Sequence, residues 1–282
     1  MPRGPDGVLL VDKPTGVTSH DVVDAVRRAL GTKKVGHAGT LDPMATGLLL
    51  VGVGRATRLL RFFGDLPKAY EGTARLGVET DTLDADGAVV RTSDVSVSRE
   101  EVERAFAELV GESLQRPPAY SAVKVGGRRL YEAARAGQAL EAPPRAIRVD
   151  EIRVRAFDGT DVEFAVVCSG GTYVRVLIAD VGEALGCGAH LRRLRRTGIG
   201  PYRAEDASSP DALGTPLPLE EAVGHLPKIE LGDEEARAAS NGRILAPAGI
   251  DGPYAAFGPG GRLIGIYRDE GAKSRPEVII PP

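Results

Sequence analysis

One glycine-rich segment places a carboxylate and an imidazole within a few residues of each other. It spans residues 36–47 and carries His37 and Asp42, the latter just before Pro43 and a short distance ahead of the apolar run that begins at Leu48. An Asp-Pro pair alone is typical of a turn. A carboxylate on a loop that leads into a buried strand also suits a nucleophile, because functional side chains are often carried on loops held by a rigid scaffold. Asp42 is therefore the first candidate for chemistry.

The same segment fits other kinds of site less well. Its glycines would let the backbone approach a nucleotide, but neither a Gly-Lys-Ser/Thr phosphate loop nor a Gly-x-Gly-x-x-Gly fingerprint is present. His37 alone is a weak candidate for a metal ligand or a base, since the chain has four histidines and no Cys-x-x-Cys pair. We therefore expect no metal site here.

A second candidate segment is a tight turn that opens a helix. It reads Ser-Gly-Gly-Thr-Tyr-Val-Arg from Ser169 to Arg175. Taken alone, this pattern is typical of packing at a helix N-terminus. An arginine that reached an otherwise buried carboxylate would lower the pKa of that acid and keep it ionised, as a nucleophilic aspartate requires. Arg175 could therefore keep an aspartate ionised.

A third candidate segment is strongly basic. Residues 189–197 contain Arg192, Arg193, Arg195 and Arg196, more than an ordinary solvated strand needs, so we interpret the segment as an edge that binds phosphates. Residues 188–203 carry five arginines and no acid, whereas residues 204–235 carry one lysine and nine acids. The net charge is −3, but a polyanion responds to the local potential. Solvated helix faces are the alternative reading, and the segregation favours a polyanionic partner.

Composition sets the broad class. The chain has 282 residues, of which 42% are apolar and 27% charged, as in soluble globular proteins. No apolar run is long enough to cross a bilayer, and the N-terminus does not read as a secretion signal. Cys168 and Cys187 are the two cysteines, so we expect neither a disulfide framework nor a zinc site, and a cytoplasmic location.

The elements that must position these candidates alternate irregularly. The patterns predict strands at residues 8–11, 48–53, 70–78, 147–157 and 162–168, and helices at residues 20–30, 55–63, 99–110, 128–137 and 173–185. Ser19 is expected to cap the first helix and Gly31 to end it, while residues 33–47 read as an exposed loop. A linker-like region follows residue 204, and the last fifty or so residues suit a small all-β domain. Without a regular βαβ rhythm, α+β is the expected class.

Several motifs carry a resemblance that runs over almost all of residues 7–203. They are Leu-Val-Asp-Lys-Pro-Thr-Gly from Leu10, Gly-His-Ala-Gly-Thr-Leu-Asp-Pro from Gly36, Lys-Ala-Tyr from Lys68, Gly-Val-Glu-Thr-Asp-Thr from Gly77, Pro-Pro-Ala-Tyr-Ser-Ala-Val-Lys from Pro117, and Gly-Thr-Tyr-Val-Arg from Gly171. Together they resemble the bacterial tRNA pseudouridine-55 synthases, a branch that also contains guide-RNA-dependent enzymes of archaea and eukaryotes.

The resemblance implies an architecture. It implies the α+β pseudouridine synthase fold, with a central mixed, largely antiparallel sheet and an active-site cleft across its middle. Residues 1–228 would form the catalytic domain, and residues 229–282 would form a small all-β RNA-binding domain that resembles the PUA type.

The resemblance also implies a site and a substrate. Asp42 would be the catalytic nucleophile and Arg175 would pair with it. Tyr70 would pack against the target base, Tyr173 and Leu194 would line the uracil pocket, and His37 would fill the space left by the extruded nucleotide. Phosphate contacts are expected from five basic residues: Lys13, Arg192, Arg193, Arg195 and Arg196.

The substrate implied is uridine 55 in the T-loop of tRNA. Its isomerisation involves no redox change or group transfer, so no cofactor is expected, and the chain is expected to act as a monomer without an obligate protein partner or a membrane. Two alternatives stay open at this point: an RNA-binding protein or tRNA-folding chaperone without catalysis, and a guide-RNA-dependent enzyme that works in a complex.

Overall fold

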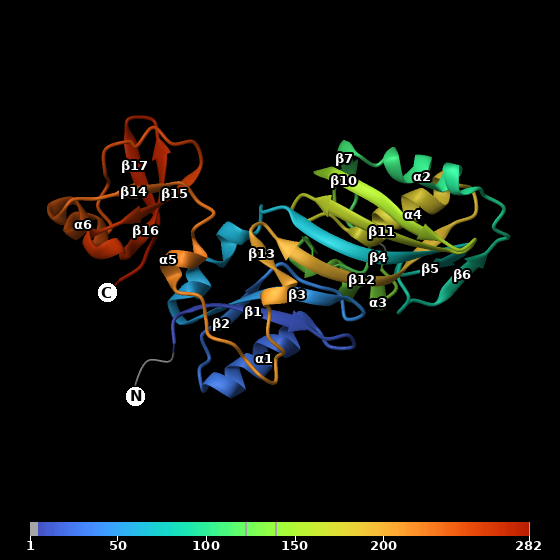
Figure 1. The fold of residues 1–282 in the computed structure, drawn as a ribbon, viewed down its shortest axis with the longest axis horizontal. Helices are drawn as coiled ribbons and strands as arrows, with labels where there is room; N and C mark the ends of the chain where they lie inside the picture. Colours follow the sequence, from blue (N-terminus) through green and yellow to red (C-terminus); the bar gives the residue numbers. More distant parts are fainter. Residues whose placement is uncertain (1–4, 122, 139, 282) are drawn as a thin grey trace.

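The computed structural model describes residues 5–121, 123–138 and 140–281, so of the motif residues quoted above only Ala122 lies outside it. A nine-stranded sheet forms the body of the molecule, in the order β1-β3-β12-β4-β11-β10-β7, with β2 added to β3 and β13 added to β12 (Figure 1). Its strands are β1 (Gly7–Lys13), β2 (Val35–Ala38), β3 (Thr46–Val53), β4 (Lys68–Leu76), β7 (Gly111–Gln115), β10 (Arg145–Phe157), β11 (Asp161–Cys168), β12 (Ala189–Ile199) and β13 (Tyr202–Arg203). Only the short β3–β12 pairing is parallel, which confirms a mixed, largely antiparallel sheet.

Short elements surround this sheet. They are α1 (Ser19–Leu30), η1 (Gly54–Arg58), η2 (Leu60–Phe63), α2 (Arg99–Ala107), α3 (Leu130–Arg135), α4 (Val174–Ala184) and η3 (Ala204–Asp206), with the ribbons β5 (Val78–Thr80)–β6 (Val89–Thr92) and β8 (Lys124–Val125)–β9 (Arg128–Arg129). Helix α4 packs on β12 and α2 packs on β10 and α4, so both helices cover the same side of the sheet (Figure 1). No helix in the described ranges is long and apolar enough to cross a membrane.

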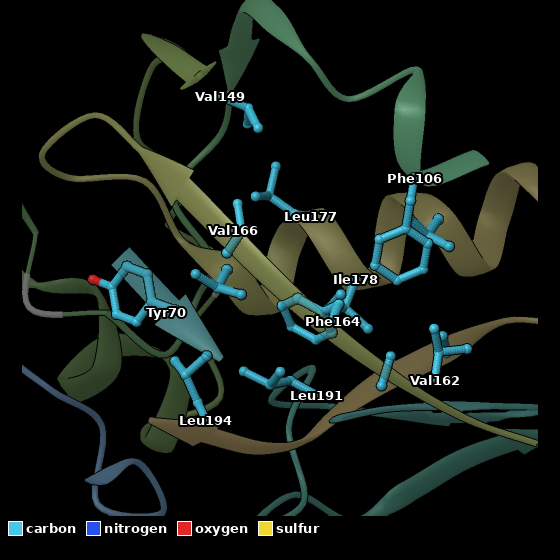
Figure 2. Packing of buried hydrophobic residues seen from close by; sticks show 14 of the residues in the cluster. Tyr70, Phe106, Val149, Val162, Phe164, Val166, Leu177, Ile178, Leu191 and Leu194 are labelled. Atoms are coloured by element: carbon cyan, nitrogen blue, oxygen red, sulfur yellow. The ribbon is translucent and has the colours of Figure 1, made fainter. Parts of the chain in front are cut away.

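The main hydrophobic core lies between that side of the sheet and the two helices. Figure 2 shows Phe106 of α2 beside Phe164 of β11, with ring centroids 5.6 Å apart, and Leu177 and Ile178 of α4 in the same cluster. Tyr70 lies at one end of this cluster, with its hydroxyl pointing away from the other side chains. The core therefore ends at an aromatic ring whose polar tip is directed out of it.

The start of α1 differs from the expectation. Thr18, not Ser19, caps the helix: its side chain accepts a hydrogen bond from the Asp21 N–H, and the Asp21 carboxylate accepts one from the Thr18 N–H. This reciprocal arrangement needs an acidic residue three positions after the cap, which Thr18 has. Gly31 ends the helix with a left-handed φ of 61°, as predicted.

Two further segments also differ from the expectation. Part of the expected loop at residues 33–47 is a strand, β2, which pairs with β3 along its full length. Residues 54–63 form the two 3-10 helices η1 and η2 instead of one α-helix. The three-residue spacing of Arg55, Arg58 and Arg61 matches the three residues per turn of a 3-10 helix. That row of arginines binds the end of the chain, since Arg58 donates to the Ile279 carbonyl at 2.6 Å and Arg61 to the Glu277 carboxylate at 2.9 Å.

A smaller sheet forms the C-terminal part. Strands β14 (Lys228–Glu230), β15 (Pro253–Phe257), β16 (Leu263–Glu270) and β17 (Lys273–Ile279) follow one another in space, joined by α6 (Asp233–Ser240) and η4 (Pro259–Gly261). The expectation of an all-β unit misses α6, whose buried Ala236 and Ala239 pack on the sheet. Figure 1 shows this sheet beside η1, η2 and α5 (Leu219–Ala222).

The region expected to be a linker is part of the main body. The N–H groups of Val8 and Asp12 in β1 donate to the carbonyls of Leu217 and Ser208, at 3.0 and 2.9 Å. The segment therefore covers the free edge of β1, where a flexible linker would leave backbone groups unpaired. The prolines of this segment are typical of a linker, but its other residues keep the N–H and carbonyl groups that pair with β1.

Candidate active site

The loop that carries Asp42 connects β2 to β3 and is fastened by buried polar groups. Ser19, at the start of α1, accepts a hydrogen bond from the Leu41 N–H at 2.9 Å and donates one to the Leu41 carbonyl at 3.2 Å. The Gly16 N–H donates to the Pro43 carbonyl at 2.9 Å. The backbone on both sides of Asp42 is therefore fixed by the segment that joins β1 to α1.

Lys13, for which the resemblance implies a phosphate contact, also helps to hold this loop. Its side chain is buried, and Nζ donates to the carbonyls of Pro14, Val17 and Pro43 at 2.9, 2.7 and 3.2 Å. Burial lowers the pKa of Lys13 to about 8, with the Asp42 carboxylate opposing that shift. The three carbonyls thus take up the ammonium donors in this structure, and the phosphate contact expected of Lys13 stays a prediction.

Arg196 is buried in the same way. It is 1% exposed, and its guanidinium donates to the carbonyls of Leu48 and Gly39, at 2.7 and 3.0 Å. Strand β12 lies between β3 and β4 and is not the expected edge of the sheet. From this interior strand Arg196 holds the loop that carries Asp42, and its expected phosphate contact stays a prediction.

Asp42 meets Arg175 as the motifs imply. The Arg175 Nε and the Asp42 Oδ2 are 3.5 Å apart, with the arginine side chain 4% exposed and the aspartate side chain 37% exposed. At this separation the pair is an ion pair without a short hydrogen bond. The carboxylate is therefore partly exposed to solvent and lies beside a buried cation.

The two terminal nitrogens of Arg175 serve other acceptors. Nη1 donates to the Asp84 carboxylate at 3.3 Å and to the Thr82 carbonyl at 3.2 Å, and Nη2 donates to the Tyr120 carbonyl at 2.6 Å. The planar fork of Arg175 therefore faces Asp84 and two carbonyls. This geometry fixes the guanidinium plane and leaves Nε for Asp42.

Asp84 is a site residue that the sequence analysis missed. It falls in a stretch that reads as an acidic turn, and nothing in that pattern distinguishes a buried acid from its solvated neighbours. The turn is held against β12, since the Leu191 N–H donates to the Leu83 carbonyl at 3.0 Å. Leu83, with φ of 65°, is the sole non-glycine residue with positive φ in the described part of the chain. The strained turn places Asp84, which is 4% exposed, beside Arg175.

The electrostatics at Asp42 have opposing contributions. Burial raises the pKa of its carboxyl group, Arg175 lowers it, and the neighbouring Asp84 and Asp86 raise it again, so the net direction is upward. The expected effect of Arg175 has the predicted sign, but burial outweighs it. Arg175 thus limits how far the pKa of Asp42 rises and favours the ionised form.

Aromatic and apolar side chains lie next to the loop that carries Asp42. Tyr70 of β4 and Leu194 of β12 are 8% and 9% exposed and belong to the same hydrophobic cluster as Leu41, the residue before Asp42 (Figure 2). Burial raises the pKa of the Tyr70 hydroxyl, which keeps it protonated, although Arg196 opposes the shift. Tyr173, half-buried, lies with its ring centroid 5.7 Å from the Arg175 guanidinium carbon. The structure therefore brings the expected pocket residues to one place.

His37 lies on β2, ahead of the Asp42 loop. Its imidazole is half-buried, and burial and Arg196 lower its pKa, so the ring is neutral at pH 7. A neutral imidazole suits packing among nucleobases better than pairing with a phosphate. Its expected place in the space left by an extruded nucleotide stays a prediction.

Comparison with known proteins addresses identity. The model of the "TruB family pseudouridylate synthase (N terminal domain)" matches residues 27–174. Models of the "tRNA pseudouridylate synthase B C-terminal domain" and of "tRNA Pseudouridine synthase II, C terminal" match residues 175–215 and 226–281. This chain belongs to the TruB family of pseudouridylate synthases.

Relatives of this TruB-family chain span nearly its whole length. A tRNA pseudouridine synthase B of Mycobacterium sp. (strain KMS) is 46% identical over 286 residues, which cover 98% of this chain and 96% of the relative. That of Thermobifida fusca (strain YX) is also 46% identical, over 97% of this chain and 98% of the relative. A solved Cbf5-Nop10-Gar1 complex has a chain 29% identical with a TM-score of 0.76, covering 98% of this chain and 85% of that one. The resemblance and fold that the motifs imply are confirmed.

Three other arginines of β12 are expected phosphate contacts in this TruB-family chain, and they lie on the face of the sheet opposite Leu194. Adjacent strand residues point to opposite faces, so Arg195 points away from the Leu194 side, and it makes two hydrogen bonds to the Asp12 carboxylate at 3.0 and 2.8 Å. Arg193 donates to the Thr73 hydroxyl at 3.3 Å, and Arg192 pairs with Asp161. A phosphate contact by Arg192, Arg193 or Arg195 stays a prediction, and it applies to RNA on that face of the sheet, away from Leu194.

Proposed function

We propose that this chain isomerises uridine 55 in the T-loop of tRNA to pseudouridine, with Asp42 as the nucleophile. Membership in the TruB family supports the reaction, and the relatives named tRNA pseudouridine synthase B support the substrate. The observation that carries the assignment of Asp42 is its position: a partly exposed carboxylate, 3.5 Å from the buried Arg175 and next to the apolar cluster that contains Tyr70 and Leu194.

The reaction needs a carboxylate and a closed pocket. The bond between N1 of uracil and C1′ of ribose breaks, the base turns, a C5–C1′ bond forms, and the proton on C5 leaves while N1 gains one. The Asp42 carboxylate either attacks the sugar or base or promotes loss of the base by stabilising charge, and both routes require its ionised form. The detached uracil must stay in place while it turns, which an apolar aromatic wall favours.

Arg175 orients and ionises the nucleophile in this proposal. Its guanidinium plane is set by Asp84, Thr82 and Tyr120, so Nε presents a fixed positive group to Asp42. A preorganised charge of this kind needs no rearrangement when the reaction starts. Tyr70 and Tyr173 would hold the base on the remaining sides.

Access to the target base requires that it leave the T-loop stack, at a cost of about a few kcal/mol. We assign that task to residues 1–228 as the catalytic domain, with His37 replacing the base and residues 229–282 adding RNA contacts. The chain acts in the cytoplasm as a monomer on free tRNA, without cofactor or obligate protein partner. The continuous apolar cluster shared by Phe63 and Ile266 supports joint action of the two parts.

The test is pseudouridine mapping on an unmodified tRNA transcript, incubated without cofactors with the wild-type chain or with Asp42→Asn. One new pseudouridine at position 55 with the wild type alone is the expected result, with tRNA binding by the variant unchanged within about three-fold. Modification of the transcript by the Asp42→Asn variant would exclude Asp42 as the nucleophile. Binding without modification by either protein would favour a chaperone or a partner-dependent enzyme.

A further inference from the structure

Two side chains outside the expected site converge on Tyr173. Gln115 ends β7 and Arg145 begins β10, and the two residues are directly paired across these antiparallel strands. The Gln115 Oε1 accepts a hydrogen bond from the Tyr173 N–H at 2.8 Å, and its Nε2 donates to the Tyr173 carbonyl at 3.1 Å. The Arg145 guanidinium carbon lies 4.7 Å from the centroid of the Tyr173 ring, and the group also donates to the Gly171 carbonyl. One residue holds the backbone of Tyr173, and the other covers its ring.

The backbone contact has a particular form. Tyr173 immediately precedes α4 in an extended conformation (φ −93°, ψ 105°), and no side chain caps the helix from that position. A primary amide that meets both the N–H and the carbonyl of one residue reproduces the hydrogen bonds of a neighbouring strand. Gln115 is 4% exposed, so loss of its amide would leave the Tyr173 N–H without a partner in a place that water reaches poorly, while the Tyr173 carbonyl would keep the N–H groups of Val176 and Leu177.

The same residue is linked to the buried cation. The chain that leaves Gln115 reaches Tyr120 five residues later, and the Tyr120 carbonyl accepts the 2.6 Å hydrogen bond from Arg175 Nη2. Arg175 lies two residues after Tyr173 in α4. A closed loop of contacts thus runs from Gln115 through Tyr120 and Arg175 to Tyr173 and back to Gln115. A shift at Gln115 would move both the pocket wall and the partner of Asp42.

We propose that Gln115 and Arg145 are positioning residues for the isomerisation, which fix Tyr173 and, through it, Arg175 beside Asp42. The inference rests on the proposed function. Gln115 sets the position of the backbone, and Arg145 restricts the tilt of the ring through a cation–π contact. Neither side chain needs to touch the uridine, because a displacement of about 1 Å in the groups that do touch it costs roughly 100-fold in rate.

The kinetic test compares Gln115→Leu with Leu114→Ala, a matched change of the exposed neighbour on β7. With tRNA transcript as substrate, Gln115→Leu is expected to lower kcat roughly 10- to 100-fold while KM stays within about three-fold. Leu114→Ala is expected to keep both constants. A kcat for Gln115→Leu within two-fold of the wild type would overturn the proposal.

A purely structural effect is separated by two further variants. Val26→Ala removes buried volume from the separate cluster under α1 and lowers the melting temperature without touching Tyr173. If Val26→Ala loses as much kcat as Gln115→Leu at equal loss of melting temperature, positioning is refuted. Arg145→Gln combined with Gln115→Leu is expected to lose less than the product of the single losses, because both act on Tyr173. Independent, multiplicative losses would contradict a shared target.

A final readout does not depend on activity. The chain has seven tyrosines, which can be replaced by 3-fluorotyrosine and observed by fluorine NMR, with the Tyr173 signal assigned from Tyr173→Phe. In Gln115→Leu that signal is expected to shift or broaden while those of Tyr254 and Tyr267, in the C-terminal sheet, stay in place. An unchanged Tyr173 signal would sink the proposal even if the wild type modified no tRNA, and a wild type without activity would refute the proposed function separately.

Discussion

Replacing Arg175 with lysine tests the site most directly. The arginine donates to Asp84, Thr82 and Tyr120 while its Nε faces Asp42. A lysine ammonium is a point charge that cannot reach acceptors arranged around a planar fork. Because Asp84 offers the closest compensation for a buried cation, we expect the ammonium to move to that side and to leave Asp42.

The magnitude follows from the hydrogen bonds that a lysine cannot make. A hydrogen bond that involves a charged group contributes about 1.5–3 kcal/mol, and a lysine that keeps one of the three acceptors of the terminal nitrogens gives up the other two. Arg175→Lys should therefore lower the free energy of unfolding by about 3 kcal/mol, near the lower end of that sum, since the charge of Asp84 stays compensated. The rate of pseudouridine formation should fall roughly 100-fold, as expected for a nucleophile displaced by about 1 Å.

The prediction also gives the direction in which the pH dependence of the rate should change. Arg175 lowers the pKa of Asp42 against the effect of burial, so a cation drawn toward Asp84 lets that pKa rise further. The ionised nucleophile then disappears at a higher pH, and the acidic limb of the single-turnover rate should move to higher pH in Arg175→Lys. Arg155→Lys, the same change in an exposed arginine paired with Glu71, serves as the control and should alter neither rate nor profile.

Single-turnover rates on tRNA transcript between pH 5 and 9, together with urea unfolding, check both parts. A wild-type rate with an unmoved acidic limb in Arg175→Lys would show that the guanidinium neither orients nor ionises Asp42. A lower rate with an unmoved limb would leave orientation as its function and refute the electrostatic part.

Three more changes test the surroundings of Asp42. Burial lowers the pKa of Lys13 from its ordinary 10.5 to about 8, so between these values the unfolded chain binds more protons than the folded one. Urea unfolding at pH 7.5 and 10 should therefore show wild-type stability rising relative to Lys13→Met, and a constant difference would contradict this. Ser19→Ala should cost about 1–3 kcal/mol by urea unfolding, because the buried Leu41 N–H and carbonyl lose their partner, and no loss would show that water replaces the hydroxyl. Tyr70→Phe should keep kcat within about ten-fold in the mapping assay if the ring supports the base by packing, whereas Tyr70→Ala should lose far more, and equal losses would assign the function to the hydroxyl.

The sequence indicated the candidate site residues better than the residues that hold them. Asp42, Tyr70 and Arg175 lie in motifs with unusual residue combinations, and the structure places them together. The burial of Lys13 and Arg196 could not be predicted, because a basic residue next to other polar residues looks like a surface residue. Only the strand order shows that β12 is interior and that its Arg196 is buried.

Elements were predictable where a local rule determines them. The capping box at Ser98 and the left-handed Gly31 fix helix ends by contacts within a few residues. Asp84 and Gln115 depend on partners 91 and 58 residues away, at Arg175 and Tyr173. No periodicity or spacing encodes contacts of that range, so a single sequence cannot show which acid or amide is buried.

The two buried cations also affect the pKa of neighbouring groups. Lys13 and Arg196 donate to neutral backbone carbonyls, so their charge is not cancelled by the groups that hold them. Their field appears at neighbouring groups, since Lys13 opposes the burial that raises the pKa of Asp42, and Arg196 adds to the burial that lowers the pKa of His37. At Asp42 the effect of Lys13 adds to that of Arg175, so these two cations favour the ionised carboxylate against burial and against the charges of Asp84 and Asp86.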